Sequence, residues 1–169
     1  MFSRRDTLFL IAGAAPLLAA PASADDWKTY RNARFGTTID YPDRFRSGRP
    51  PDNGGGLGFS SRDGAKFVVY GSHNVLEHDL AGLEADTMEE RDKSERVTYR
   101  DRGANWFVIS GTRGDDEFYE RHLLSHDGKI VNGFVMSYPA RLRGAYDPIV
   151  TRMSRSFRAS RGADTEGNP

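Results

Sequence analysis

Apolar and polar residues alternate along several short segments of the chain, which is the pattern of half-buried β-strands. In residues 35–42 every second side chain, from Phe35 to Tyr41, is suited to a buried face, and the intervening ones are mostly polar or small. The turn-forming residues 32–34 precede this segment, and they come at the end of a first run, residues 27–32, that contains Trp27 and Tyr30. This arrangement predicts an N-terminal β-hairpin.

Further strands are separated by turn signals along most of the chain. Residues 58–60 and 65–71 flank Asp63-Gly64, a dipeptide that favours tight hairpin turns. Four later segments are separated by gaps that each contain Gly or Asp-Gly, so we expect them to pair as an antiparallel meander. These segments are residues 96–101, 105–111, 117–126 and 130–138.

Two segments have the three-to-four-residue apolar spacing of helices. The first is predicted to start at Asn74 as its N-cap, with Glu77 reaching back to the cap, and to run to about Lys93 with Glu84 in solvent. The second has Asp147 as a potential N-cap and Pro148 at the first helical position. It either begins there or extends backwards through residues 139–146.

The predicted order of elements is ββ-ββ-α-ββββ-α. A mostly antiparallel sheet with segregated helices is typical of an α+β fold. We therefore expect one α+β domain over residues 25–158, and a disordered polar tail over residues 159–169.

The N-terminal residues 1–24 have the pattern of a cleavable signal peptide. Arg4 and Arg5 are followed by an apolar stretch of about 13 residues, which is too short to span a bilayer, and Ala22-Ser23-Ala24 forms a small-x-small cleavage site. Because Ser3-Arg4-Arg5-Asp6 partly matches the twin-arginine signal, export in the folded state is expected. An ordinary secretory signal is the alternative. The sequence predicts a periplasmic or secreted protein.

Composition excludes several classes of function. Residues 1–24 hold two of the 24 basic and one of the 24 acidic residues, so the remaining chain is close to neutral. A neutral chain has no field that attracts nucleic acid or an anionic membrane. The sequence contains no cysteine, which excludes disulfides, lipoprotein anchoring, thiolate catalysis and cysteine-ligated metals.

Several short motifs resemble the PsbP-like family of extrinsic proteins. They are Phe35-Gly36 followed by Tyr41-Pro42-Asp43, and Met153 followed by Ser156-Phe157 near the end of the closing helix. The similarity extends in pattern over most of residues 27–158. This resemblance implies a sheet flanked by helices and an accessory, non-catalytic role. It assigns no functional residue to this chain.

The candidate binding residues lie in a glycine-rich loop and at the start of the first predicted helix. Backbone amides of such a loop can bind an anion, but phosphate-binding motifs need a helix directly afterwards, and here a strand follows. We expect the hairpin topology to bring the two segments together as a surface for a small ligand or a protein partner. The candidates are Asp52, Asn53, Gly54, Gly55, Gly56, His73 and Asn74.

No catalytic residue, metal ligand or cofactor is predicted. His73 and His78 are five residues apart, which is poor spacing for a metal on a helix, and His122 and His126 would lie about 13 Å apart on one strand. All four histidines are therefore interpreted as surface residues. The chain has no Gly-x-Ser-x-Gly motif for a serine nucleophile.

The sequence thus favours a periplasmic accessory or binding module that acts through a surface patch. Its partner would be an unknown protein or a small ligand of the cell envelope, and we expect a monomer without a transmembrane segment in the mature form. Two alternatives stay open. One is a small envelope hydrolase that uses scattered His and Asp residues, and the other is a carrier of a metal or small ligand.

Overall fold

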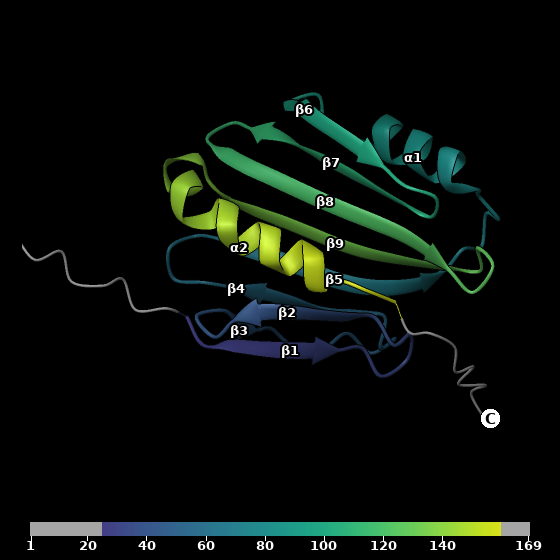
Figure 1. Ribbon diagram of the computed structural model, residues 1–169, viewed down its shortest axis with the longest axis horizontal. Coiled ribbons are helices and arrows are strands. Elements are labelled where there is room, and N and C mark those ends of the chain that lie inside the picture. Colours follow the sequence, from purple (N-terminus) through teal and green to yellow (C-terminus); the bar gives the residue numbers. More distant parts are fainter. Residues whose placement is uncertain (1–24, 160–169) are drawn as a thin grey trace, which may run out of the picture.

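Seven strands form one antiparallel sheet in the computed structural model, which describes residues 25–159 (Figure 1). The strand order is β3-β4-β5-β9-β8-β7-β6, so β5 pairs with β9 and joins the first hairpin to the later meander. The strands are β3 (Arg46–Ser47), β4 (Gly56–Ser60), β5 (Lys66–His73), β9 (Ile130–Pro139), β8 (Asp116–Ser125), β7 (Trp106–Arg113) and β6 (Glu95–Arg102).

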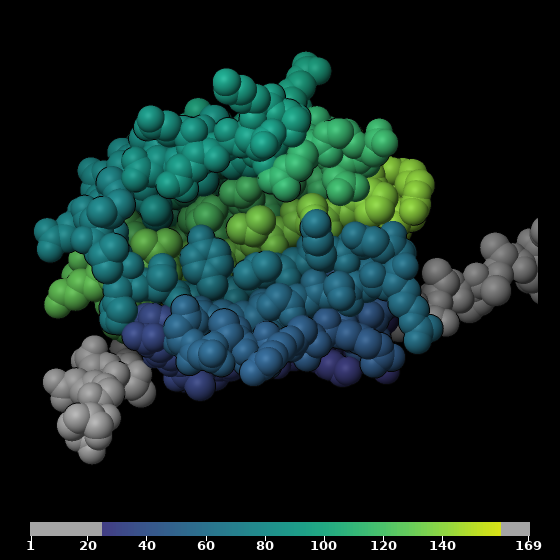
Figure 2. Space-filling model, turned by 180° about the vertical axis from the view of Figure 1, so that it is seen from behind, coloured from purple at the N-terminus to yellow at the C-terminus, as the bar shows by residue number. Residues whose placement is uncertain are grey.

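Two further strands, β1 (Trp27–Arg31) and β2 (Thr38–Pro42), form a separate hairpin. This hairpin and α2 (Arg143–Ser156) cover one face of the seven-stranded sheet, whereas α1 (Leu80–Glu89) lies on the other face (Figure 1). A 3-10 turn, Ala140–Leu142, connects β9 to α2. Seen from behind, the surface of β8 and β9 is set back between α1 and β6 on one side and β4 and β5 on the other (Figure 2).

Alternation along the strands divides the apolar residues between two cores. The larger core lies under α2 and the hairpin, where Phe67, Phe134 and Met153 are fully buried. The smaller core lies under α1 and is formed by the buried side chains of Phe107, Ile109 and Phe118, with Leu80, Leu83 and Met88 from the helix and Val97 from β6 packed on it. The predicted fold class is therefore confirmed, since the protein is α+β with a mostly antiparallel sheet.

The predicted start of the first helix is wrong. The helix begins at Leu80, and Asp79 is its N-cap because the Asp79 side chain accepts a hydrogen bond from the amide of Gly82. Glu77 has a φ of 54°, which is incompatible with a helical turn. Glu84, expected in solvent, is buried and pairs with Arg100 and Arg102 of β6.

Two other boundaries also differ from expectation. The closing helix starts at Arg143, so the alternative with a backward extension is correct and Pro148 lies in its second turn. Strand β8 ends at Ser125, and His126 lies in the turn with a φ of 53°, not on the same strand as His122. His122 is 5% exposed, so the prediction that it is a surface residue is wrong.

Two predicted segments fall wholly or partly outside the described residues. The signal peptide, residues 1–24, and residues 160–169 of the predicted tail are not described. No helix within residues 25–159 is long and apolar enough to cross a membrane.

Candidate functional site

Five connecting segments meet at one end of the sheet, which we call the loop end (Figure 1). They are joined by contacts between segments far apart in the sequence, such as those of Asn32 with Gly54 and of Asn74 with Lys129. Loops placed on a rigid scaffold are the usual position of binding residues. The loop end consists of residues 32–37, 52–56, 73–79, 103–105 and 126–129.

Hydrogen bonds of asparagine side chains hold the segments of the loop end together. Asn32 is 2% exposed; its side-chain oxygen accepts from the amides of Arg34 and Phe35, and its side-chain nitrogen donates to the carbonyl of Gly54 at 2.8 Å. Asn32 thereby ties the turn between β1 and β2 to the glycine-rich loop. The short amide side chain can serve both as donor and as acceptor to main-chain groups, which suits it to this task.

Asn132 has the same role inside the sheet. It is fully buried, accepts a hydrogen bond from the hydroxyl of Thr37 at 2.8 Å, and donates to the hydroxyl of Ser125 at 2.9 Å. Its contacts connect the hairpin turn to the end of β8. Together these bonds hold the loop end in one arrangement, which reduces the entropy lost when a partner binds.

The loop end contains a pocket of about 770 Å³, within the size range of ligand sites. It lies between the linker that follows β5, the β6–β7 turn and the β8–β9 turn. Asn105 from the second of these turns is bonded to the main chain of Leu124. The pocket is lined by Asn74, Glu77, His78, Asp79, Leu80, Ala104, Asn105, Leu124, Ser125, His126, Asp127, Gly128 and Lys129.

Three residues that line the pocket have strained backbone conformations. Glu77, His126 and Asp127 have φ values of 54°, 53° and 53°, and they are the three non-glycine residues with positive φ among residues 25–159. A side chain costs energy in this region, and such residues gather at functional sites where the surroundings hold them. His126 and Asp127 occupy the β8–β9 turn, where a tight hairpin connection uses this conformation, whereas Glu77 lies in the linker between β5 and α1.

Two neighbouring aliphatic side chains stand exposed in the linker of the same pocket. Val75 is 82% exposed and Leu76 is 69% exposed. Together they form a small apolar surface that is available to a partner. The linker that carries them is anchored by Asn74, whose side chain donates to the carbonyls of His78 and Gly128.

The structure places all seven sequence-predicted binding residues at the loop end but not in one site. Asn74 lines the pocket, whereas His73 packs edge-to-face on the ring of Phe35, with 5.2 Å between ring centroids. Within the glycine-rich loop, the Asn53 side chain accepts from the amide of Gly55, and the Asn53 carbonyl accepts from Arg34. Asp52, Asn53, Gly54, Gly55 and Gly56 therefore lie against the hairpin turn and β5, outside the pocket lining.

On the face of the sheet that α1 covers, three polar side chains in a row are arranged like the groups of a catalytic site. The Tyr70 hydroxyl lies 3.3 Å from His122 Nδ1, and His122 Nε2 lies 3.3 Å from Glu120 Oε2. Burial raises the pKa of Tyr70 to about 12, so its hydroxyl stays protonated at neutral pH. A nucleophilic tyrosine needs the opposite shift, so Tyr70 is not activated for nucleophilic attack in this arrangement.

The pocket holds one hydroxyl–imidazole contact, between Ser125 Oγ and His126 Nδ1 at 3.1 Å. A serine nucleophile also needs a group that orients its histidine. Within residues 25–159, His126 forms no ion pair with a carboxylate, and no group of three or more metal-ligating side chains could hold a metal ion. Ser125 and His126 therefore lack, among residues 25–159, the carboxylate that would complete a serine–histidine–acid triad.

Replacement of Asn74 by alanine is expected to destabilise the protein by about 1–2 kcal/mol, because three hydrogen bonds with main-chain groups are lost. Amide hydrogen exchange in residues 75–79 should quicken, which mass spectrometry would measure. Asn53→Ala is the matched control, since Asn53 has one side-chain bond, to the exposed amide of Gly55. Unchanged exchange in residues 75–79 of the Asn74 variant would contradict this role.

Comparison with known proteins gives a result for the fold alone. No protein-family model matches the chain, and no curated protein matches its sequence. The arrangement of helices and strands is nevertheless that of a known structural class, small α+β proteins with a PsbP-like or Mog1-like fold.

The individual structures define that class. The cyanobacterial PsbP protein CyanoP of Synechocystis sp. PCC 6803 superposes with a TM-score of 0.60 at 11% identity, over 88% of this chain and 99% of that chain. Mog1p of Saccharomyces cerevisiae, which is named as a Ran-binding protein, gives a TM-score of 0.56 at 14% identity, over 80% and 96%. The resemblance to PsbP-like proteins is thus confirmed for the fold.

Proposed function

We propose that this chain is an exported accessory protein of the cell envelope that binds a polypeptide partner through its loop end. The observation that carries the proposal is the pocket with strained residues beside the exposed pair Val75 and Leu76. Residues 1–24 support export through their signal-peptide pattern. The accessory role is the one that the PsbP-like fold suggests.

The charges around the pocket indicate the chemistry of the partner. Its lining includes the carboxylates of Glu77, Asp79 and Asp127 but a single lysine, Lys129. Carboxylates repel an anionic membrane surface, so the exposed aliphatic pair is better suited to a protein than to lipid. We infer a partner segment that carries an apolar side chain beside a lysine or arginine.

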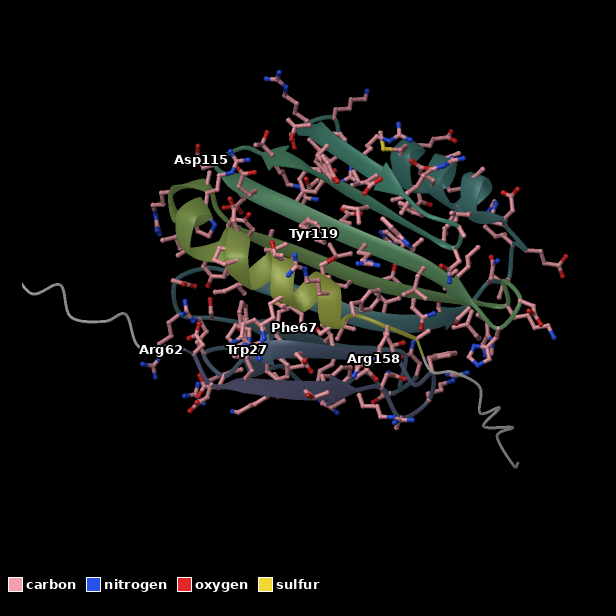
Figure 3. The ribbon with its side chains drawn as sticks, viewed as in Figure 1. Trp27, Arg62, Phe67, Asp115, Tyr119 and Arg158 are labelled. Atoms are coloured by element: carbon pink, nitrogen blue, oxygen red, sulfur yellow. The ribbon has the colours of Figure 1, made fainter. Side chains whose placement is uncertain are left out.

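Site-specific photo-crosslinking tests this proposal in cells. A benzophenone amino acid at Leu76 is expected to form an adduct with one envelope protein, whereas the same residue at Arg62, at the opposite end of the molecule, should not (Figure 3). Asp127→Asn should lower the yield of the adduct severalfold, and Asp115→Asn at the far end is the matched control. Intact mass spectrometry identifies the adduct.

Three outcomes would contradict the proposal. Equal adducts at Leu76 and Arg62 would show that the loop end is not distinguished from the rest of the surface. A small molecule retained by the protein from its own envelope, with no protein adduct, would favour the carrier alternative. Protein purified from cells with residues 1–24 still attached would exclude cleavage and export.

A further inference from the structure

The first residues after the predicted cleavage site are fixed to the folded domain. Asp25 accepts two hydrogen bonds from Arg44, with Nε to Oδ1 at 2.8 Å and Nη2 to Oδ2 at 2.5 Å. The main-chain carbonyl of Asp26 accepts a bond from the amide of Asp43 at 2.8 Å. We call these four residues the N-terminal clamp.

Arg44 is itself held by its surroundings. It lies two residues after the end of β2 and directly precedes Phe45, which is 3% exposed in the larger core. Its guanidinium also interacts with the hydroxyl of Tyr146, a buried residue of α2 that donates to Asp63. The Asp25 side chain is 17% exposed, so it is bound against the domain and not displayed in solvent.

The clamp leaves no spacer between the domain and the bond that a signal peptidase would cut. The small-x-small motif Ala22-Ser23-Ala24 places that bond between Ala24 and Asp25. A protease must accommodate several residues on each side of the cut bond, so folded segments are cleaved from locally opened states. Both residues on the mature side of this bond are held in the closed clamp.

We propose that the N-terminal clamp controls signal-peptide removal, so that cleavage proceeds from the state in which Asp25 and Asp26 have left Arg44 and Asp43. This inference rests on the proposed export. The reaction is hydrolysis by an envelope signal peptidase. Water adds across the peptide bond, its oxygen ends in the carboxylate of Ala24, and the amino group of Asp25 is released with the proton.

The export route decides whether the clamp matters. The twin-arginine route carries proteins that are already folded, so the clamp is closed when the precursor meets the peptidase. When clamp opening is fast relative to cleavage, the rate follows the population of the open state. A weaker clamp therefore gives faster maturation of a folded precursor, whereas an unfolded precursor has no clamp to open.

Cleavage of the purified, folded full-length precursor by purified signal peptidase in detergent micelles tests the clamp. Arg44→Gln is expected to be cleaved about two- to fivefold faster than the wild type, the range for a solvent-accessible bidentate pair. Arg46→Gln, on the exposed strand β3, is the matched control and should leave the rate unchanged. Mass spectrometry follows the appearance of a chain that begins at Asp25.

A second precursor carries four Gly and Ser residues inserted between Ala24 and Asp25. It should be cleaved faster than the wild type, and Arg44→Gln should have no further effect in it, because the cut bond no longer touches the clamp. This precursor keeps the test decisive if Arg44→Gln fails to fold. Wild-type precursor unfolded in urea should be cleaved at the rate of the spacer variant. The effect of urea on the peptidase itself is measured with a short peptide substrate, and the rates are corrected for it.

The outcomes separate the clamp from the proposed export. Cleavage after Ala24 at one common rate in the wild type, Arg44→Gln and the spacer variant would overturn the clamp and leave export intact. Failure of the peptidase to cut any precursor, or a cut at another bond, would overturn the proposed processing and the clamp with it.

Discussion

Replacement of both Arg4 and Arg5 by lysine is expected to leave the protein in the cytoplasm with residues 1–24 attached. Lysine keeps the two positive charges that any secretory signal needs at this position, so only a receptor that distinguishes the guanidinium from the ammonium responds to the change. The twin-arginine route makes that distinction. Fractionation of cells, with the size of the protein in each fraction, measures the effect.

The matched control for this export experiment is the pair Arg31→Lys and Arg34→Lys in the folded domain, which should be exported like the wild type. Export of the lysine variant at the wild-type level would contradict the twin-arginine route and assign the protein to general secretion. Export of the lysine variant would also mean that the clamp is not closed when the signal peptide is removed, because general secretion delivers an unfolded chain.

The strands could be predicted from sequence because alternation and turn dipeptides are local signals. The meander from β6 to β9 and the hairpin around Asp63 both follow from them, and each appears within two residues of its predicted bounds. The pairing of β5 with β9 had no such signal, since it joins residues far apart in the sequence, such as Tyr70 and Gly133.

The first helix shows why a local motif can mislead. Asn74 and Glu77 have the spacing of a capping box, but the Asn74 side chain bonds to the carbonyl of Gly128, 54 residues away. Residues 74–77 form an isolated turn, and the helix is capped by Asp79 instead. A tertiary hydrogen bond to the β8–β9 turn therefore overrides the local preference. No pattern within residues 74–93 contains that information.

Only part of the candidate site could be predicted from the sequence, because contacts between distant segments also define the pocket. The candidate loop and Asn74 both lie at the loop end, yet the pocket is completed by Asn105, His126 and Asp127, which no sequence motif connects with Asn74. Recurrent asparagines at the ends of strands were the available signal. Their positions could be found in the sequence, but the segments that they join could not.

Replacement of Arg91 by methionine is expected to lower the free energy of unfolding by about 3–5 kcal/mol, as when one partner of a buried ion pair is removed. The Arg91 side chain is 8% exposed and lies 2.8 Å from both Glu95 and Glu120. Methionine would still pack on Phe118, whose ring lies 4.4 Å from the guanidinium, but it would leave two buried carboxylates poorly paired. Urea unfolding at pH 7 measures the loss.

The pKa of Glu120 determines how its contribution to the free energy of unfolding changes with pH. Burial alone would raise the pKa of Glu120, but hydrogen bonds from His122 and Arg91 and the charge of Arg91 outweigh it and lower the pKa from 4.5 to about 2. A carboxyl group with a lowered pKa stabilises the fold above its unfolded value and loses that contribution as pH falls. Glu120 therefore contributes on the order of 3 kcal/mol at neutral pH, lost between about pH 4.5 and 2.

In Arg91→Met burial prevails, so the pKa of Glu120 rises and acid relieves the unpaired charge. The difference in stability between the wild type and this variant should thus be largest above about pH 5 and shrink towards pH 3, the opposite of a simple packing defect. Adding Glu120→Gln to the variant should restore part of the loss, while Arg96→Met on the exposed side of β6 should cost less than about 0.5 kcal/mol. A loss that is equal at pH 7 and pH 3 would show that Arg91 acts through packing and not through its charge.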